Sequence, residues 1–186
     1  KYDFFIGIDS YLGAEINSFL QFSYARVHNM PFFELDDNST YSNKFLVIYD
    51  NVNHFSLNSE IDWAMNKNSN FSLKLDYHNY DLDSLIDYAY KPTIISKLGF
   101  LYNIGDKIIP EIELVCFVDR STVEDSGWSN SPVLNDIVDI DFTLEYKYNT
   151  IFSAYFELKN LIGNYQIWEN YPVLGPQVFF GLSYRL

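Results

Sequence analysis

The most constraining feature of this chain is a strict alternation of apolar and polar residues that returns in several segments. In residues 138–149 every second residue is apolar, and the residues between them are polar or charged. The same period of two recurs in residues 71–78, 152–159 and 178–186. This period is typical of a β-strand with one apolar face, whereas an amphipathic helix needs apolar residues at third and fourth spacings. No segment shows helical spacing, so the sequence predicts an all-β fold.

The longest alternating run covers residues 43–65. Its apolar face holds Phe45, Val47, Tyr49, Phe55, Leu57, Ile61, Trp63 and Met65, and is interrupted by Asn51, Asn53 and Ser59. At about 3.3 Å per residue this strand is ~75 Å long. Tilted by ~40°, it still rises roughly twice the ~25 Å apolar band of an outer-membrane barrel. We expect it to cross a bilayer and to project beyond it.

Composition and charge exclude several other classes. The chain is 48% hydrophobic and 19% aromatic, a bias that favours strands and membrane interfaces. Its net charge of −13 is opposite to the basic footprint of nucleic-acid binding. No apolar run reaches the ~18 residues of a transmembrane helix. The first residues do not resemble a signal peptide. The single Cys116 excludes an internal disulfide and a Cys-rich zinc site, and we expect it to face lipid.

The lengths of the connections indicate which kind of β fold this is. Nine strands are predicted, at residues 2–12, 15–29, 43–65, 70–82, 94–105, 108–121, 136–149, 151–163 and 175–186. Short links alternate along the chain with long connections at 30–42, 83–93, 122–135 and 164–174. Transmembrane barrels sort their connections in this way, with tight turns at the periplasmic rim, whereas a sandwich does not. The sequence predicts an antiparallel transmembrane β-barrel.

The number of strands bears on completeness. If the last strand ends in the periplasm, counting back through nine strands places Lys1 at the outer rim. Bacterial single-chain barrels have an even number of strands and both termini inside. We therefore expect residues 1–186 to be one incomplete domain, which is the C-terminal part of a longer barrel or is completed by strands from elsewhere.

The C-terminal residues resemble a known family. Residues 160–168 read Asn-Leu-Ile-Gly-Asn-Tyr-Gln-Ile-Trp, and they are followed by Tyr171-Pro172, Gly175 and a final alternating segment. This order resembles the closing segment of TonB-dependent receptors and their relatives. The residues Tyr-His-Asn-Tyr at 77–80, then Lys91-Pro92 and residues 98–106, are also similar to such barrels. The resemblance covers roughly the last two thirds of the chain.

The resemblance carries several implications. The final strand would be the signal that the outer-membrane insertion machinery reads, with Val178, Phe180, Leu182, Tyr184 and Leu186 on one face. The family usually ends in Phe or Trp, whereas this chain ends in Leu186. Whole receptors of this type take up a nutrient or metal complex across the outer membrane of Gram-negative bacteria, around a plugged barrel of ~22 strands. No plug domain is recognisable in residues 1–186, so transport is implied only for a whole receptor.

The alternation also predicts what each face would contact. We expect aromatic girdles on the lipid face, with Trp63, Tyr102, Tyr146, Tyr148 and Tyr184 at the periplasmic end and Tyr80, Trp128, Tyr165, Trp168 and Tyr171 at the outer end. The opposite face would be a polar lumen wall carrying Lys74, Asp76, His78, Asp139, Asp141, Glu145, Lys147, Glu157 and Lys159. Acidic residues in the long connections show no calcium-site spacing, so we expect them to be solvated.

Catalysis is a weak alternative. The only histidines are His28, His54 and His78. Although His78 shares a face with Ser72 and Asp76, these residues lie along one strand, whereas a catalytic triad requires convergence. We expect no enzyme, no metal site and no cofactor.

Three functions remain open at this stage. The first is the wall of a TonB-dependent-type transport barrel, and the second is a non-transporting barrel subunit that scaffolds a secretion or protein-insertion complex. The third is a soluble β-sandwich binding module. The expected partners of a barrel are outer-membrane lipid and lipopolysaccharide, the insertion machinery, and other outer-membrane or periplasmic proteins, but not nucleic acid.

Overall fold

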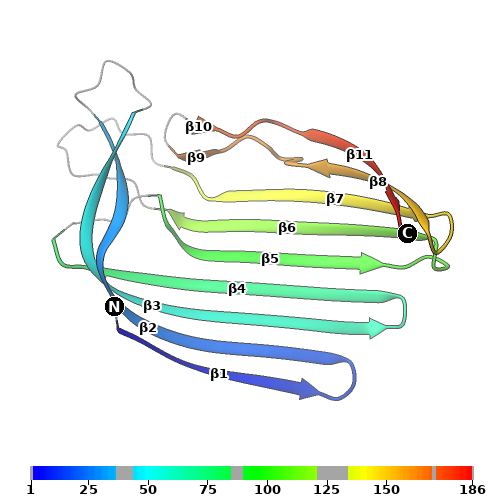
Figure 1. Cartoon of the computed structure of the whole chain (residues 1–186), viewed down its shortest axis with the longest axis horizontal. Coiled ribbons are helices and arrows are strands. Elements are labelled where there is room, and N and C mark those ends of the chain that lie inside the picture. Colours follow the sequence, from blue (N-terminus) through cyan, green and yellow to red (C-terminus); the bar gives the residue numbers. More distant parts are fainter. Residues whose placement is uncertain (1, 37–43, 85–89, 121–133, 169–170, 186) are drawn as a thin grey trace.

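The computed structural model is built from antiparallel strands (Figure 1). It describes residues 2–36, 44–84, 90–120, 134–168 and 171–185. Nine strands form one sheet: β1 (Tyr2–Leu12), β2 (Ile16–Leu35), β3 (Phe45–Asn66), β4 (Ser69–Leu82), β5 (Pro92–Tyr102), β6 (Ile108–Arg120), β7 (Ile137–Lys147), β8 (Phe152–Lys159) and β11 (Gln177–Tyr184). From β1 to β8 each strand pairs with the next along the chain, β8 pairs with β11, and β1 and β11 are the edges. The all-β, antiparallel prediction is confirmed.

Within these residues there is no helix of the length and apolarity needed to cross a bilayer. Local side-chain hydrogen bonds close the β3–β4, β5–β6 and β7–β8 turns. At the β7–β8 turn, the Asn149 side chain accepts hydrogen bonds from the backbone N–H of Ile151 at 2.9 Å and of Phe152 at 2.7 Å. At the β5–β6 turn, Gly105 and Asp106 take positive φ, which glycine and aspartate tolerate well.

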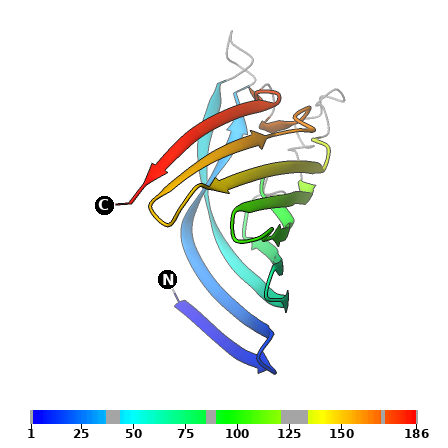
Figure 2. The same cartoon turned by 90° about the vertical axis from the view of Figure 1, so that its right-hand side faces the viewer.

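The sheet has one apolar and one polar face, as the alternation predicts. Cross-strand register aligns Phe22, Leu57 and Tyr77 on the first face, and Gln21, Asn58 and Asp76 on the second. The buried residues of β3 and β7 all belong to the polar face and are Asp50, Val52, Ser56, Ile137 and Asp139. Figure 2 shows the sheet curling. Side chains crowd together on the concave face of a curved sheet. Because the buried residues of β3 and β7 lie on the polar face, we assign the polar face as the concave wall.

Two strand ends and one connection differ most from the predictions. Strand β2 continues to Leu35 instead of ending at residue 29, because a bulge between Val27 and Met30 absorbs the irregularity, with Asn29 at φ 54°. Strand β8 stops at Lys159 instead of residue 163, because Asn160 takes a positive φ. The predicted loop 164–174 contains a small hairpin, β9 (Gln166–Trp168) with β10 (Tyr171–Pro172). These features depend on local backbone geometry that a period of two does not encode.

One glycine on the concave wall is required by packing. Gly181 lies directly opposite Tyr155 in the β8–β11 pair, and a Cβ at position 181 would overlap the Tyr155 ring. A tyrosine ring lying across a facing glycine fills the space that the missing side chain leaves. A side chain at position 181 would therefore displace the Tyr155 ring.

Candidate functional site: the concave wall and its outer end

Polar side chains pair across strands along the concave wall. The Lys74 ammonium binds the Glu60 carboxylate at 2.7 Å, and Lys97 binds Glu113 at 3.3 Å. Nearer the long-loop end of the wall, the Asn58 amide donates a hydrogen bond to Asp76 at 2.7 Å. The predicted lumen residues lie on this face: Lys74, Asp76, His78, Asp139, Asp141, Glu145, Lys147, Glu157 and Lys159. The wall presents both charge signs, so it can contact water and polar solutes along its length.

A histidine–aromatic group lies on the same wall toward the long-loop end. His54 Nε2 and His78 Nδ1 are 3.2 Å apart, and the His54 ring stacks on Tyr80 with centroids 4.6 Å apart. The Lys91 ammonium lies 5.7 Å from the centre of the Tyr80 ring and 5.4 Å from that of Phe32. Burial lowers the pKa of Lys91. We call His54, His78, Tyr80, Lys91 and Phe32 the histidine–aromatic group.

The sequence places His78 on the lumen wall but does not predict its contact with His54. A signal for their pairing existed in the short β3–β4 turn. Because this turn is tight, the two strands pair by simple counting, which sets His54 opposite Tyr80 and Ser56 opposite His78. Lys91 and Phe32 carried no such signal, because both lie in or near long connections.

Two carboxylates on β7 hold the segment that follows β8. Asp139 Oδ1 accepts hydrogen bonds from the backbone N–H of Ile140 at 2.8 Å and of Ile162 at 3.0 Å. Asp141 Oδ1 accepts one from the N–H of Asn160 at 2.9 Å. These two lumen-wall residues are therefore structural. Burial, together with the neighbouring Asp139 carboxylate, raises the pKa of Tyr165 to about 12.

Arg120 is buried at the end of β6 and joins three segments. Its Nη1 donates to the Ile167 carbonyl at 3.0 Å, and its Nη2 donates to the Asn135 carbonyl at 2.8 Å. It borders a cavity of about 320 Å³ that is also lined by Asn164 and Tyr165. Arg120 fixes the residues before β7 and the β9–β10 hairpin relative to one another.

Aromatic rings tie the β9–β10 hairpin to the far ends of β2 and β3. Trp168 lies 4.7 Å from Phe33 and 5.1 Å from Phe45, measured between ring centroids, and Tyr171 lies 5.7 Å from Phe45. Tyr90 completes the set at 5.6 Å from Phe45. We call these five residues the outer aromatic cluster. It joins connections that are far apart in the sheet order.

The predicted girdle residues have two kinds of surroundings. Trp63, Tyr102, Tyr146, Tyr148 and Tyr184 lie at the short-turn end and are exposed, Tyr184 by 67%. At the other end, Trp168 and Tyr171 belong to the outer aromatic cluster, Tyr165 is half-buried, and Tyr80 lies on the concave wall. Trp128 lies outside the described residues. The predicted girdle thus has an exposed rim at one end and mostly protein-contacting rings at the other.

The predicted insertion signal lies on the last strand. Val178, Phe180, Leu182 and Tyr184 share the apolar face of β11 and are exposed, Phe180 by 77%. Leu186 lies outside the described residues. The alternating apolar stripe is thus available to another molecule along the sheet edge.

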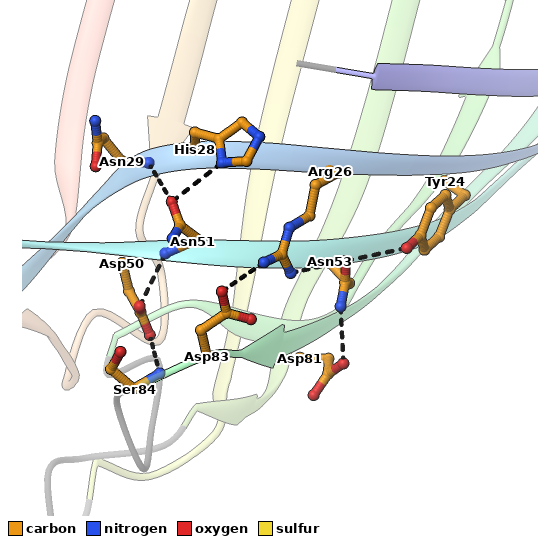
Figure 3. A network of polar contacts seen from close by, with 10 residues as sticks. All are labelled: Tyr24, Arg26, His28, Asn29, Asp50, Asn51, Asn53, Asp81, Asp83 and Ser84. Atoms are coloured by element: carbon orange, nitrogen blue, oxygen red, sulfur yellow. Dashed lines mark hydrogen bonds and ion pairs between the residues drawn. The ribbon is translucent and has the colours of Figure 1, made fainter.

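A polar network interrupts the apolar face at its long-loop end (Figure 3). Arg26 forms an ion pair with Asp83 and donates to Asn53 Oδ1 at 2.9 Å, and Asn53 donates to Asp81 at 3.1 Å. Tyr24 donates to the same Asn53 oxygen at 3.0 Å. By register, this network begins beyond Phe22, Leu57 and Tyr77, so it marks where the apolar face ends.

Comparisons with known proteins place this fold. No family model and no curated protein matches the sequence. Among solved structures, the chain is similar to the copper transporter OprC, with a TM-score of 0.71 and 11% identity over 98% of this chain and 30% of that one. It is also similar to the pyoverdine outer membrane receptor FpvA from Pseudomonas aeruginosa PAO1, with a TM-score of 0.69 and 14% identity over 99% of this chain and 29% of that one.

A third similar structure is the ferric-catecholate import receptor Fiu from E. coli K12, with a TM-score of 0.68 and 13% identity over 98% of this chain and 27% of that one. The chain thus spans less than a third of the length of these receptors. The predicted resemblance is confirmed at the level of fold. The nine-stranded sheet has the fold of the barrel wall of TonB-dependent outer-membrane receptors.

Proposed function

We propose that this chain forms part of the wall of an outer-membrane barrel that takes up a nutrient or a metal complex, in the manner of a TonB-dependent receptor. One observation carries the proposal: a single curved sheet with an apolar, aromatic-rimmed face and a charged concave face matches receptor barrels over nearly its whole length. Such a two-faced wall separates lipid from an aqueous lumen. The barrel wall has no catalytic role in this proposal.

We propose that cargo contacts the histidine–aromatic group within this barrel. The histidine–aromatic group lies at the long-loop end of the concave wall, where a solute from outside would first meet the lumen. Flat rings and a half-buried ammonium provide stacking and charge for recognition. The similar structures are a copper transporter, a pyoverdine receptor and a ferric-catecholate import receptor, and their names motivate testing metals and metal chelates.

The test is uptake by cells. A deletion strain is compared with its parent for accumulation of radioactive iron chelates, copper and labelled oligosaccharides. Transport predicts the loss of one uptake activity, the same loss in a TonB-deficient strain, and rescue by the intact gene. If every uptake rate is unchanged while other outer-membrane proteins are depleted, the scaffold alternative replaces this proposal.

The proposed partners follow from the two exposed surfaces. The apolar face and its rim would contact outer-membrane lipid and lipopolysaccharide, and the β11 stripe would be read by the insertion machinery. A Phe180→Asp substitution should lower the amount of folded protein in outer membranes several-fold, because a charge interrupts the stripe. A matched Gln177→Asp change on the polar side of β11 should have little effect, and equal losses in both variants would contradict the signal.

A further inference from the structure

The two histidines of the concave wall have the separation of a pair of metal ligands. His54 Nε2 and His78 Nδ1 are 3.2 Å apart and come from adjacent strands. Two imidazole nitrogens at about 2.0–2.1 Å from one ion, at angles between square and tetrahedral, stand ~2.8–3.4 Å apart. The observed separation falls in that range, so an ion could take the place of the hydrogen bond between the rings.

The surrounding structure holds both rings in place. The His54 ring stacks on Tyr80 at an interplanar angle of 11°, and on His78 with centroids 5.3 Å apart. Both histidines are half-buried on rigid strands. Ligands that are fixed before binding lose little freedom when the ion arrives, which favours a site built on strands.

Charges around the pair act in opposite directions. Asp76 lies two residues before His78 on the same face and attracts a cation. Lys91 repels one, but its ammonium is directed onto the Phe32 and Tyr80 rings. Among the described residues, no third His, Cys, Asp or Glu gathers with the pair. Any bound ion would therefore keep open positions for water or for donor atoms of an incoming molecule.

We propose that His54 and His78 form a two-nitrogen transition-metal site on the lumen wall, which binds Cu²⁺ most tightly and Zn²⁺ and Ni²⁺ more weakly. Imidazole suits all three ions, and Cu²⁺ leads the stability order for nitrogen sites. The site requires only the concave wall, so it does not rest on transport. In a receptor it would hold a metal that exchanges its open positions with a passing ligand.

The experiment uses the native protein that contains this chain, purified from outer membranes in detergent without a histidine tag. CuCl₂ is titrated into the wild type and into His54→Asn, His78→Asn and His28→Asn variants, with electron paramagnetic resonance as the readout. His28 is the matched control, because it lies in the outward polar network against Asn51. We expect one copper coupled to two nitrogens in the wild type, with affinity about tenfold or more weaker in the first two variants and unchanged in His28→Asn.

Copper binding that survives both His54→Asn and His78→Asn, or that His28→Asn weakens equally, would overturn the proposal. Folding of each variant is checked by heat-modifiable gel mobility. If the first two variants fail to fold, the proposal is tested on the wild type, by labelling its histidines with diethyl pyrocarbonate and measuring the labels by mass spectrometry. Cu²⁺ should then protect His54 and His78 and leave His28 reactive, and unprotected His54 and His78 would contradict the site.

Discussion

At the scale of single residues, the structure distinguishes side chains that the alternation treats as equal. Asp139 and Asp141 share the lumen face with Glu157 and Lys159, yet only the two aspartates bind the backbone after β8. Gly181 similarly differs from Gly175, because only Gly181 faces a ring. These differences give residue-level predictions with internal controls.

Replacing Gly181 with alanine should destabilise the sheet by about 0.5–1.5 kcal/mol, because the new Cβ overlaps the far end of the Tyr155 ring and forces this partly exposed side chain off its rotamer. The midpoint of urea unfolding in detergent, followed by tryptophan fluorescence, measures the change. Gly175→Ala is the control, since a Cβ at position 175 meets nothing within 4 Å. Equal midpoints for the two variants would contradict the close approach.

The raised pKa of Tyr165 predicts a pH dependence. Because the folded-state pKa is about 12 and the usual value is 10, the stability from the protonated hydroxyl is fully present below pH 10. It is lost as the pH rises toward 12. The Tyr165→Phe variant should therefore lose less stability than the wild type between pH 10 and 12, as measured by urea midpoints. A Tyr148→Phe variant, at an exposed position, should follow the wild type.

At the scale of elements, each strand presents two chemically distinct faces. Strand β4 shows this most simply, because Lys74 binds Glu60 on the concave wall while the next residue, Leu75, is exposed on the apolar face. The β9–β10 hairpin shows a different principle, since rings rather than backbone pairing tie it to β2 and β3.

Adjacent positions on β4 test the lipid-facing assignment. Leu75→Arg should cost about 2–4 kcal/mol of unfolding free energy in bilayers, because a charge near the centre of the apolar band is desolvated by lipid. Lys74→Arg places the same side chain on the opposite face and should cost far less. Unfolding from lipid vesicles in urea gives both values. If Leu75→Arg is tolerated as well as Lys74→Arg, the apolar face does not meet lipid.

Removing the Trp168 ring should release the far ends of β2 and β3. In Trp168→Ala we expect faster hydrogen exchange of the backbone amides in residues 45–48, because Phe45 loses its contact with Trp168. Mass spectrometry of exchanged peptides measures this. Tyr49→Ala is the control on the same strand, since Tyr49 is exposed outside the outer aromatic cluster. Unchanged exchange at 45–48 would show that the ring contacts do not order this region.

At the scale of the whole molecule, the sheet has two edges. In the part of the chain that the structure describes, strands β1 and β11 each pair on one side only, and unpaired backbone groups are costly in lipid. The similar receptors are more than three times as long as this chain. We propose that further strands pair with both edges in the membrane.

This proposal predicts the mass of the native protein. The polypeptide recovered from purified outer membranes should be several times larger than 21.8 kDa by intact mass spectrometry, because a receptor barrel needs ~22 strands. A native chain of this size would refute it, and closure would then need strands from a partner or a second copy.

The sequence by itself determined the fold class, the number of strands in the main sheet and which side chains share a face. These follow from a local period of two, which short windows within the strands reveal. It predicted the C-terminal resemblance from the order of residues 160–186. Only the tertiary structure decided that β2 continues through a bulge, that loop 164–174 forms a hairpin, and that His54 meets His78. The reason is physical: a period places a side chain on a face, whereas convergence depends on register, sheet curvature and the path of long connections.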